Sequence, residues 1–319
     1  MNKKIILLFT LSLLVFTFLL GCSQDTSTPD NTSEKKNVIT TSTMITDLAQ
    51  VIANGSDNVT ITGIMGPGID PHLYKPTAGD AELMQKSHLI VYNGLHFEGQ
   101  MGQLFKQMKS RGIPTISLAD SMKDYEGVSF IETDEFGGTH DPHMWFDIPI
   151  WKGAAKVMKD ALIELDPQNK TLYESNAKVY LEELDKLASY VQNRLKELPV
   201  ESRVLITAHD AFNYFGRMYD FDVRGVQGIS TEAEAGTRDI KDLADFIVER
   251  KIGAIFVEAS VPRKNIEALQ AAVKAQGFNV EIGGELLSDS LSEPGGEADT
   301  YLKMIRYNVD TIVNAIQSN

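Results

Sequence analysis

Hydrophobic and polar positions alternate along most of the chain in blocks that predict strands separated by helices. Short runs rich in Val, Ile and Thr are typical of buried strands, whereas apolar residues recurring every three or four positions predict one face of a helix. In the first half, strands are predicted at residues 38–43, 59–65, 89–92 and 115–118. Helices are predicted between them at residues 45–53, 78–86 and 100–109.

The same alternation returns in the second half of the chain. Strands are predicted there at residues 204–207, 223–226, 254–257 and 280–282. Helices are predicted at residues 211–219, 240–250, 262–276 and 300–316. Because strands that alternate with helices form parallel sheets, we expect an α/β fold with two small lobes, each holding a mainly parallel four-stranded sheet.

A single long helical pattern separates the two halves, from about Asn169 to Glu197. Its apolar positions recur at steps of three and four: Tyr173, Ala177, Tyr180, Leu184, Leu187, Val191 and Leu195. About 28 residues at 1.5 Å each give a helix of roughly 42 Å, about the width of a domain. A coiled-coil segment is the alternative. A rigid strut between two lobes fits better, because the alternation of strands and helices resumes after it.

The N-terminus has the pattern of an exported protein. Lys3 and Lys4 precede an uncharged apolar run at residues 5–20, which is shorter than the ~20 residues that span a bilayer. The run ends in LLGC, and Cys22 is the only cysteine of the 319 residues. This stretch resembles a bacterial lipobox, which implies that Cys22 becomes the lipidated first residue. The alternative is an uncleaved membrane anchor with a chance cysteine.

These patterns predict five segments. They are a signal peptide (1–21), a lipidated polar tether (22–37), an N-terminal α/β lobe (38–167), a linking helix (168–198) and a C-terminal α/β lobe (199–319). The hydrophobic content of 43% is that of a folded chain and excludes a mostly disordered protein. The net charge of −14 argues against nucleic acid as a partner, because phosphate binding requires a basic face.

Familiar catalytic and nucleotide-binding motifs are absent from the sequence. It contains no GxGxxG after a strand, no GxxxxGK[ST], no GxSxG and no HExxH. The histidines are more informative, because His72, His143 and His209 each lie just beyond a predicted strand or in the loop after it. Asp289 follows the last strand, and ligands of open α/β sheets bind at this edge. Since His and Asp are common metal ligands, the four predict one metal site in a cleft between the lobes.

The other histidines have simpler explanations. His88 begins a buried strand and is expected to be a satisfied core residue, and His96 is expected to be structural. His140 is the nearest competitor of His143 as a ligand. Three carboxylates could either orient an imidazole or cap their own loops: Asp70, Asp141 and Glu258.

Several segments together resemble one known family, the zinc/manganese-binding solute-binding lipoproteins of bacterial ABC importers, some of which are also called adhesins. They are GPGIDPHLYKPTAGD, HDPHMWFD, LITAHDAFNYFG, VQGISTEAEAG and GGELLSDSL. The resemblance covers residues 38–316. It implies two α/β lobes joined by a rigid helix, with one metal ion between them.

The resemblance also implies roles for particular residues and partners. The family's first, second and fourth metal ligands correspond to His72, His143 and Asp289. Its third position is Glu or His in different members, and here it is His209. Cys22 corresponds to the lipidated cysteine. The resemblance implies that the protein is not an enzyme but passes a divalent metal to an ABC permease. We expect a monomer that is lipid-anchored on the extracytoplasmic face of the cell membrane.

The sequence leaves the choice between Mn2+ and Zn2+ open and favours manganese. Zinc importers of the family often carry a long His-rich loop, whereas residues 125–140 hold only one histidine, His140. Three imidazoles and a carboxylate suit zinc, and the Irving–Williams order also favours zinc. Asp289 could offset this by supplying two oxygens, which raises the coordination number toward the value that manganese prefers.

Two other functions compete with metal import. A zinc metalloenzyme would use the same three-His/Asp site, but it needs an open coordination position and a general base, and no helical motif supplies one. An adhesin or interaction lipoprotein without transport would leave the four convergent ligands unexplained.

Overall fold

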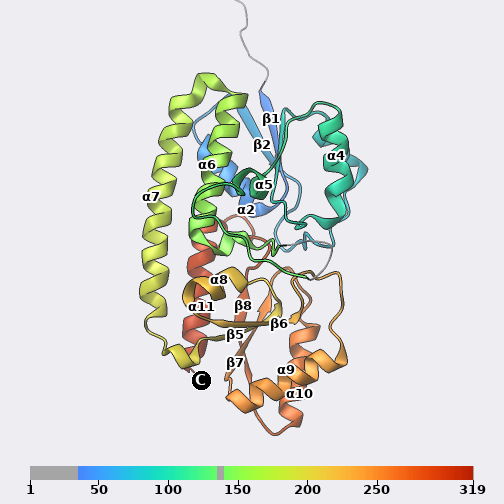
Figure 1. Cartoon of the computed structure of the whole chain (residues 1–319), viewed down its shortest axis with the longest axis vertical. Helices are drawn as coiled ribbons and strands as arrows, with labels where there is room; N and C mark the ends of the chain where they lie inside the picture. Colours follow the sequence, from blue (N-terminus) through green and yellow to red (C-terminus); the bar gives the residue numbers. More distant parts are fainter. Residues whose placement is uncertain (1–34, 135–139, 319) are drawn as a thin grey trace, which may run out of the picture. The chain divides into compact units, whose positions relative to one another are not determined.

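A four-stranded parallel sheet organises the first half of the protein in the computed structural model, which describes residues 35–134 and 140–318 (Figure 1). The strand order is β2-β1-β3-β4. The strands are β1 (Lys36–Thr40), β2 (Val59–Gly63), β3 (Leu89–Tyr92) and β4 (Thr115–Ser117). All three strand pairs are parallel, so the carboxyl ends of the four strands share one edge. Cys22 and the predicted signal peptide lie outside the described residues.

Helices connect these strands and continue past the sheet. They are α2 (Thr43–Ala53), α3 (Ala78–Gln85), α4 (Gly102–Ser110), α5 (Leu118–Met122) and α6 (Ile148–Leu165). Short 3-10 turns occur at Gly99–Met101, Met144–Phe146, Pro167–Asn169 and Val200–Ser202. Local chemistry fixes where α6 begins, because the Asp147 side chain accepts a hydrogen bond from the Ile150 amide and a proline occupies the first turn.

The second half is built on two parallel strand pairs, β5-β6 and β7-β8. The strands are β5 (Val204–His209), β6 (Asp222–Gln227), β7 (Ala254–Glu258) and β8 (Glu281–Leu286). The expected single four-stranded sheet is therefore wrong in this half. β5 and β7 lie side by side and share a hydrophobic core, but the amide of His209 donates to the Glu258 side chain. That amide is consequently not available to a backbone ladder between the two strands.

Four further helices complete the second half: α8 (Asn213–Tyr219), α9 (Thr237–Arg250), α10 (Lys264–Ala275) and α11 (Tyr301–Ser318). α11 packs against β8 and also against α7, so the last helix runs beside the long one (Figure 1). Among the described residues, no helix has both the length and the apolar character needed to cross a bilayer.

The long helix α7 (Lys170–Leu195) confirms the periodicity argument. Its buried residues are the seven predicted ones: Tyr173, Ala177, Tyr180, Leu184, Leu187, Val191 and Leu195. α7 packs against α2 and α6 of the first half and against α11 of the second. It therefore contacts both halves of the chain along one apolar face, while the division into lobes at residues 167 and 199 remains a prediction.

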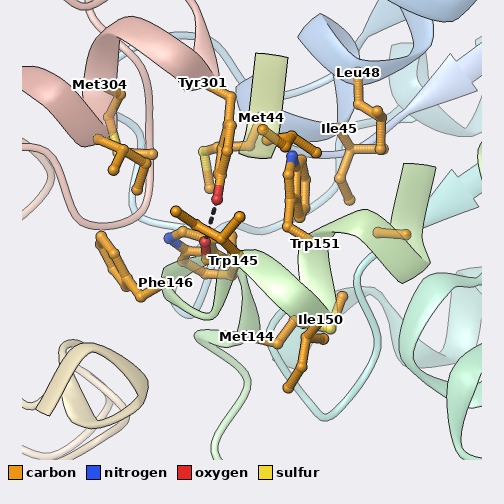
Figure 2. Close-up of a cluster of buried hydrophobic side chains, with 14 of the residues drawn as sticks. Met44, Ile45, Leu48, Met144, Trp145, Phe146, Ile150, Trp151, Tyr301 and Met304 are labelled. Carbon is orange, nitrogen blue, oxygen red and sulfur yellow. Dashed lines mark hydrogen bonds between the residues drawn. The ribbon is translucent and has the colours of Figure 1, made fainter. Parts of the chain in front are cut away.

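One hydrophobic core joins residues that lie far apart in the sequence (Figure 2). Trp151 of α6 stacks on Tyr301 of α11, with ring centroids 4.7 Å apart. The Tyr301 hydroxyl donates to the carbonyl oxygen of Trp145 at 2.7 Å. The segment that carries His143 is thus anchored to the start of the last helix.

Candidate metal centre

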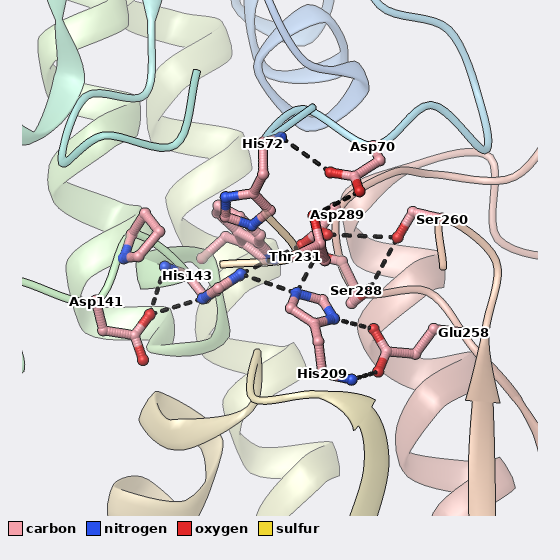
Figure 3. Close-up of polar contacts among 12 residues, drawn as sticks. Asp70, His72, Asp141, His143, His209, Thr231, Glu258, Ser260, Ser288 and Asp289 are labelled. Carbon is pink, nitrogen blue, oxygen red and sulfur yellow. Dashed lines mark hydrogen bonds and ion pairs between the residues drawn. The ribbon is translucent and has the colours of Figure 1, made fainter. Parts of the chain in front are cut away.

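The four predicted ligands come together from four separate segments (Figure 3). His72 lies in the loop between β2 and α3, His143 directly precedes the turn Met144–Phe146, and Asp289 follows β8. His209 was expected just after its strand, but it is the last residue of β5. One nitrogen or oxygen atom from each residue lies within 4.8 Å of the other three. All four side chains are buried, at most 2% exposed.

The donor atoms are close enough to surround one small ion. The Nε2 atoms of His143 and His209 are 3.2 Å apart. Asp289 presents Oδ1 to His143 Nε2 at 3.4 Å and Oδ2 to His209 Nε2 at 3.3 Å. His72 completes the group, with its ring centroid 5.4 Å from that of His143 and 5.8 Å from that of His209.

Two donor atoms of this group have no hydrogen-bond partner among the described residues. They are His72 Nε2 and Asp289 Oδ1, and both are buried. A buried polar atom without a partner costs free energy, and a cation bound between the four side chains would coordinate both atoms. The donor set therefore fits a divalent transition metal, for which imidazole nitrogen and carboxylate oxygen are common ligands.

Two carboxylates orient the histidine rings from behind (Figure 3). Asp141 Oδ1 lies 2.7 Å from His143 Nδ1, and Glu258 Oε2 lies 2.6 Å from His209 Nδ1. Each carboxylate also accepts the backbone N–H of its histidine, at 2.9 Å for His143 and 2.8 Å for His209. An Nδ1–H that donates to a carboxylate leaves the Nε2 lone pair free for a metal. For Asp141 and Glu258, the orienting role is confirmed.

Asp70, the third carboxylate considered, has the other of the two expected roles. Its Oδ1 accepts the backbone N–H of His72 at 2.9 Å, which caps the loop. Its Oδ2 accepts the hydroxyl of Thr231, from the loop after β6, at 2.6 Å. Asp70 thus fixes the main chain at His72.

Burial and the nearby carboxylate charges have opposite effects on the pKa values of the three histidines. Burial lowers the pKa of His72 to about 3, which keeps its imidazole neutral. Burial also lowers the pKa of His143 and His209, but Asp141, Glu258 and Asp289 outweigh it and raise these values to about 10 and about 9.

His143 and His209, whose pKa values are raised, share one proton between their Nε2 atoms. Two N–H groups cannot face each other across the 3.2 Å between the Nε2 atoms, so without metal the pair holds one additional proton there. Burial raises the pKa of Asp289, but the histidines lower it more, so that Asp289 stays ionised.

The remaining histidines lie outside the group of four. His140 forms an isolated antiparallel bridge with Glu132, and its ring meets Phe130 at a centroid distance of 6.1 Å. His96 has a left-handed backbone, with φ of 66°. His88 precedes β3, and its Nδ1 accepts the N–H of Asn37 at 3.1 Å, so its ring is satisfied as expected. His88 is only partly buried, however, so its expected place in the core is wrong.

Several residues around the site were missed by the sequence analysis. Asn213 donates to Asp141 Oδ2 at 3.1 Å, and the Ser260 hydroxyl donates to Asp289 Oδ2 at 3.4 Å. Thr231 reaches Asp70 as described above. Asn213 and Thr231 lie within the segments LITAHDAFNYFG and VQGISTEAEAG, which could have drawn attention to them, whereas no local pattern marks Ser260.

The fold and the site together are those of a metal-binding protein of the α/β class, and the candidate ligands His209 and Asp289 lie at or just after the carboxyl ends of β5 and β8. Residues 38–315 match the family described as zinc-uptake complex component A, periplasmic, or ZnuA. The chain belongs to this family, whose members are substrate-binding components of ABC transporters and not enzymes. The resemblance inferred from the motifs is therefore confirmed, and the metalloenzyme alternative is not supported.

Individual relatives agree with this assignment. The zinc-binding protein TroA of Treponema pallidum (strain Nichols) is 44% identical over 282 residues, which cover 88% of this chain and 89% of TroA. The manganese-binding lipoprotein MntA of Bacillus subtilis (strain 168) is 38% identical, over 96% of this chain and 98% of MntA. A solved structure of the periplasmic TroA from Treponema pallidum superposes with a TM-score of 0.84 at 43% identity, covering 88% of this chain and 99% of that chain.

Proposed function

We propose that this protein captures a divalent transition metal outside the cytoplasm and delivers it to an ABC permease. His72, His143, His209 and Asp289 are the proposed ligands. The observation that carries the proposal is the convergence of four buried donor atoms from four segments within 4.8 Å. Burying a carboxylate and three imidazoles together is costly, and a bound cation offsets that cost.

We further propose manganese as the cargo, ahead of zinc. The relatives include proteins named for each metal, TroA for zinc and MntA for manganese. Both oxygens of Asp289 face histidine nitrogens, at 3.4 Å and 3.3 Å, so both can coordinate one ion. Two oxygens and three nitrogens give five donors, and a higher coordination number suits manganese better than the tetrahedral four that zinc prefers.

We place the protein on the extracytoplasmic face of the cytoplasmic membrane, as a monomer held by a lipid on Cys22. The LLGC motif supports this, and MntA, which matches over 96% of this chain, is named a lipoprotein. An acidic chain with a net charge of −14 gains nothing from anionic lipid, so the lipid anchor alone would hold it at the membrane.

Metal analysis tests the capture step. The protein is purified without chelator from cells grown with limiting, equal amounts of manganese and zinc, and its metals are counted by mass spectrometry. We expect one ion per chain, mostly manganese. His72→Ala should lower the metal affinity at least about tenfold, because the loss of a residue that only supports a ligand already costs about 10- to 100-fold. The matched control His140→Ala should leave it nearly unchanged. Metal-free protein that cannot be loaded would contradict the proposal.

Growth experiments test the delivery step. A strain that lacks this protein should grow poorly in metal-limited medium, and added manganese should restore growth more effectively than added zinc. The His72→Ala variant, expressed at the wild-type level, should not restore growth, whereas His140→Ala should. Full growth of the strain carrying His72→Ala would show that this site does not supply the permease.

A further inference from the structure

His72 lies in a loop that contacts a segment far away in the sequence. Asp70 accepts the His72 backbone N–H with Oδ1 at 2.9 Å and the Thr231 hydroxyl with Oδ2 at 2.6 Å. Thr231 belongs to the loop after β6 and is 6% exposed. One carboxylate thus connects the ligand-bearing loop of the first half to a loop of the second half (Figure 3).

The two carboxylate-oriented ligands are held differently. The His143 ring is oriented by Asp141, two residues away in the same loop, at 2.7 Å. The His209 ring is oriented by Glu258 of the adjacent strand β7, at 2.6 Å. Each of these ligands therefore has its orienting carboxylate within its own half of the chain. Asp70 instead holds the main chain of His72, and its second oxygen binds Thr231 of the other half. The second oxygen of Asp141 likewise accepts a hydrogen bond from Asn213 of the other half, at 3.1 Å.

The loop that carries His72 lies at the surface, although His72 itself is buried. Its neighbours Ile69 and Leu73 are 39% and 49% exposed, whereas His72 is 2% exposed. A metal enclosed by four buried ligands leaves only after at least one of them moves away. The His72 loop has solvent on its outer side, so it can swing outward once its ties to the second half break.

We propose that Thr231 is a positioning residue for metal retention: its hydroxyl holds Asp70, and through Asp70 it holds His72 against the second half. Loss of this hydrogen bond then speeds metal dissociation. The inference rests on the proposed function of metal capture. A second tie acts in the same direction, since the Gly68 amide of the same loop donates to the Ser290 hydroxyl at 2.9 Å. Because this tie remains when Thr231 is changed, the site loosens without losing His72.

Dissociation kinetics test the proposal with a nearly isosteric change. Thr231→Val replaces the hydroxyl with a methyl group and removes the hydrogen bond to Asp70. Protein loaded with Mn2+, and separately with Zn2+, is mixed with excess EDTA in a stopped-flow instrument. We expect dissociation to be about tenfold faster, the factor typical of losing a hydrogen bond to a charged acceptor. Thr231→Ser, which keeps the hydroxyl, should restore a rate within about twofold of wild type.

A matched control lies one residue away. The Ser230 hydroxyl accepts the backbone N–H of Glu232 at 3.3 Å, within its own loop. Ser230→Ala removes a hydroxyl from the same loop and should leave the dissociation rate unchanged. Metal-free Thr231→Val should remain folded, with a melting temperature modestly below that of wild type, because the metal-free structure already contains the lost hydrogen bond. If Thr231→Val fails to fold, Thr231→Ala replaces it with the same expected acceleration.

The possible outcomes separate this proposal from the proposed function. Equal dissociation rates in wild type and Thr231→Val would overturn the role of Thr231 while leaving metal capture intact. Equal acceleration by Ser230→Ala, or no rescue by Thr231→Ser, would also overturn it, because either result indicates general loosening of the loop. A wild-type protein that binds neither metal would overturn both proposals.

Discussion

Metal affinity should depend steeply on pH, because the site holds a proton that the metal must displace. Burial lowers the pKa of His143, but Asp141 and Asp289 raise it by more, so that its pKa is about 10. Burial also lowers the pKa of His209, and Glu258 and Asp289 raise it by more, to about 9. The pair shares one proton between Nε2 atoms that also face the metal position. The raised pKa keeps this proton bound at neutral pH. Affinity should therefore rise as pH rises.

The expected magnitude follows from one displaced proton. When the pKa lies well above the working pH, the apparent association constant increases about tenfold per pH unit, hence about 100-fold from pH 6 to pH 8. If the one displaced proton came instead from a histidine with the ordinary pKa of 6.5, the change over the same interval would be only about fourfold, because most of that imidazole would already be neutral. The two cases are easily distinguished.

Calorimetric titration with Mn2+ measures the association constant and the number of protons released on binding. Association constants are obtained between pH 6 and pH 8, and the number of protons released is obtained from buffers with different ionisation enthalpies. We expect about one proton released per metal at pH 7.5. The double variant Asp141→Asn and Glu258→Gln removes the two carboxylate charges, and its pH profile should flatten toward the fourfold case. A fourfold rise in the wild type, or an unchanged slope in the double variant, would refute the argument.

Three further predictions concern the anchor, the core and the long helix. Cys22→Ser should leave the protein able to bind metal but release it from washed membranes into the soluble fraction; retention would indicate an uncleaved anchor. Burial raises the pKa of Asp47 from 3.8 to about 6. The folded state therefore binds the Asp47 proton more tightly than the unfolded state does, by about 3 kcal/mol. This contribution to the free energy of unfolding is complete below about pH 4 and is lost as pH rises through about 6. Asp47→Asn should therefore be more stable than wild type in urea at pH 8 and no more stable at pH 4. Solution scattering should give nearly equal radii of gyration with and without Mn2+, because α7 buries seven residues along one face and has neither Pro nor Gly; a large compaction would contradict this.

The elements that could be predicted from the sequence are those whose pattern is local. All seven buried residues of α7 followed from spacing alone, because the helical repeat determines which side chains share a face. The short helix α5 was missed, and Leu118 was assigned to the end of a strand. The chain turns there because the Ser117 hydroxyl accepts the Asp120 amide and Leu118 is fully buried. A single turn has too few residues to show a periodicity.

The arrangement of strands in the second half was less predictable, because pairing depends on contacts between distant segments. Alternation of strands and helices predicts parallel strands, and each observed pair is parallel. Whether β5 and β7 share a ladder depends on the local partners of their amides. At His209 the partner is a side chain, Glu258, which also serves the candidate metal centre. A requirement of the site thus takes precedence over regular sheet hydrogen bonding at that position.

The two Asp-Pro-His motifs show where prediction from sequence ends. In both, the aspartate Oδ1 accepts the histidine backbone N–H at 2.9 Å, so the local turn is the same at His72 and His143. The ring environments differ. Asp141 also binds the His143 ring at 2.7 Å, whereas Asp70 turns its second oxygen to Thr231 at 2.6 Å. Identical tripeptides therefore fix the main chain alike, and packing against distant segments decides what else each carboxylate contacts. Asp141 binds the His143 ring and Asn213, whereas Asp70 binds Thr231, 161 residues away. The ligands could thus be found from the motifs, but the contact that we propose governs metal release could not.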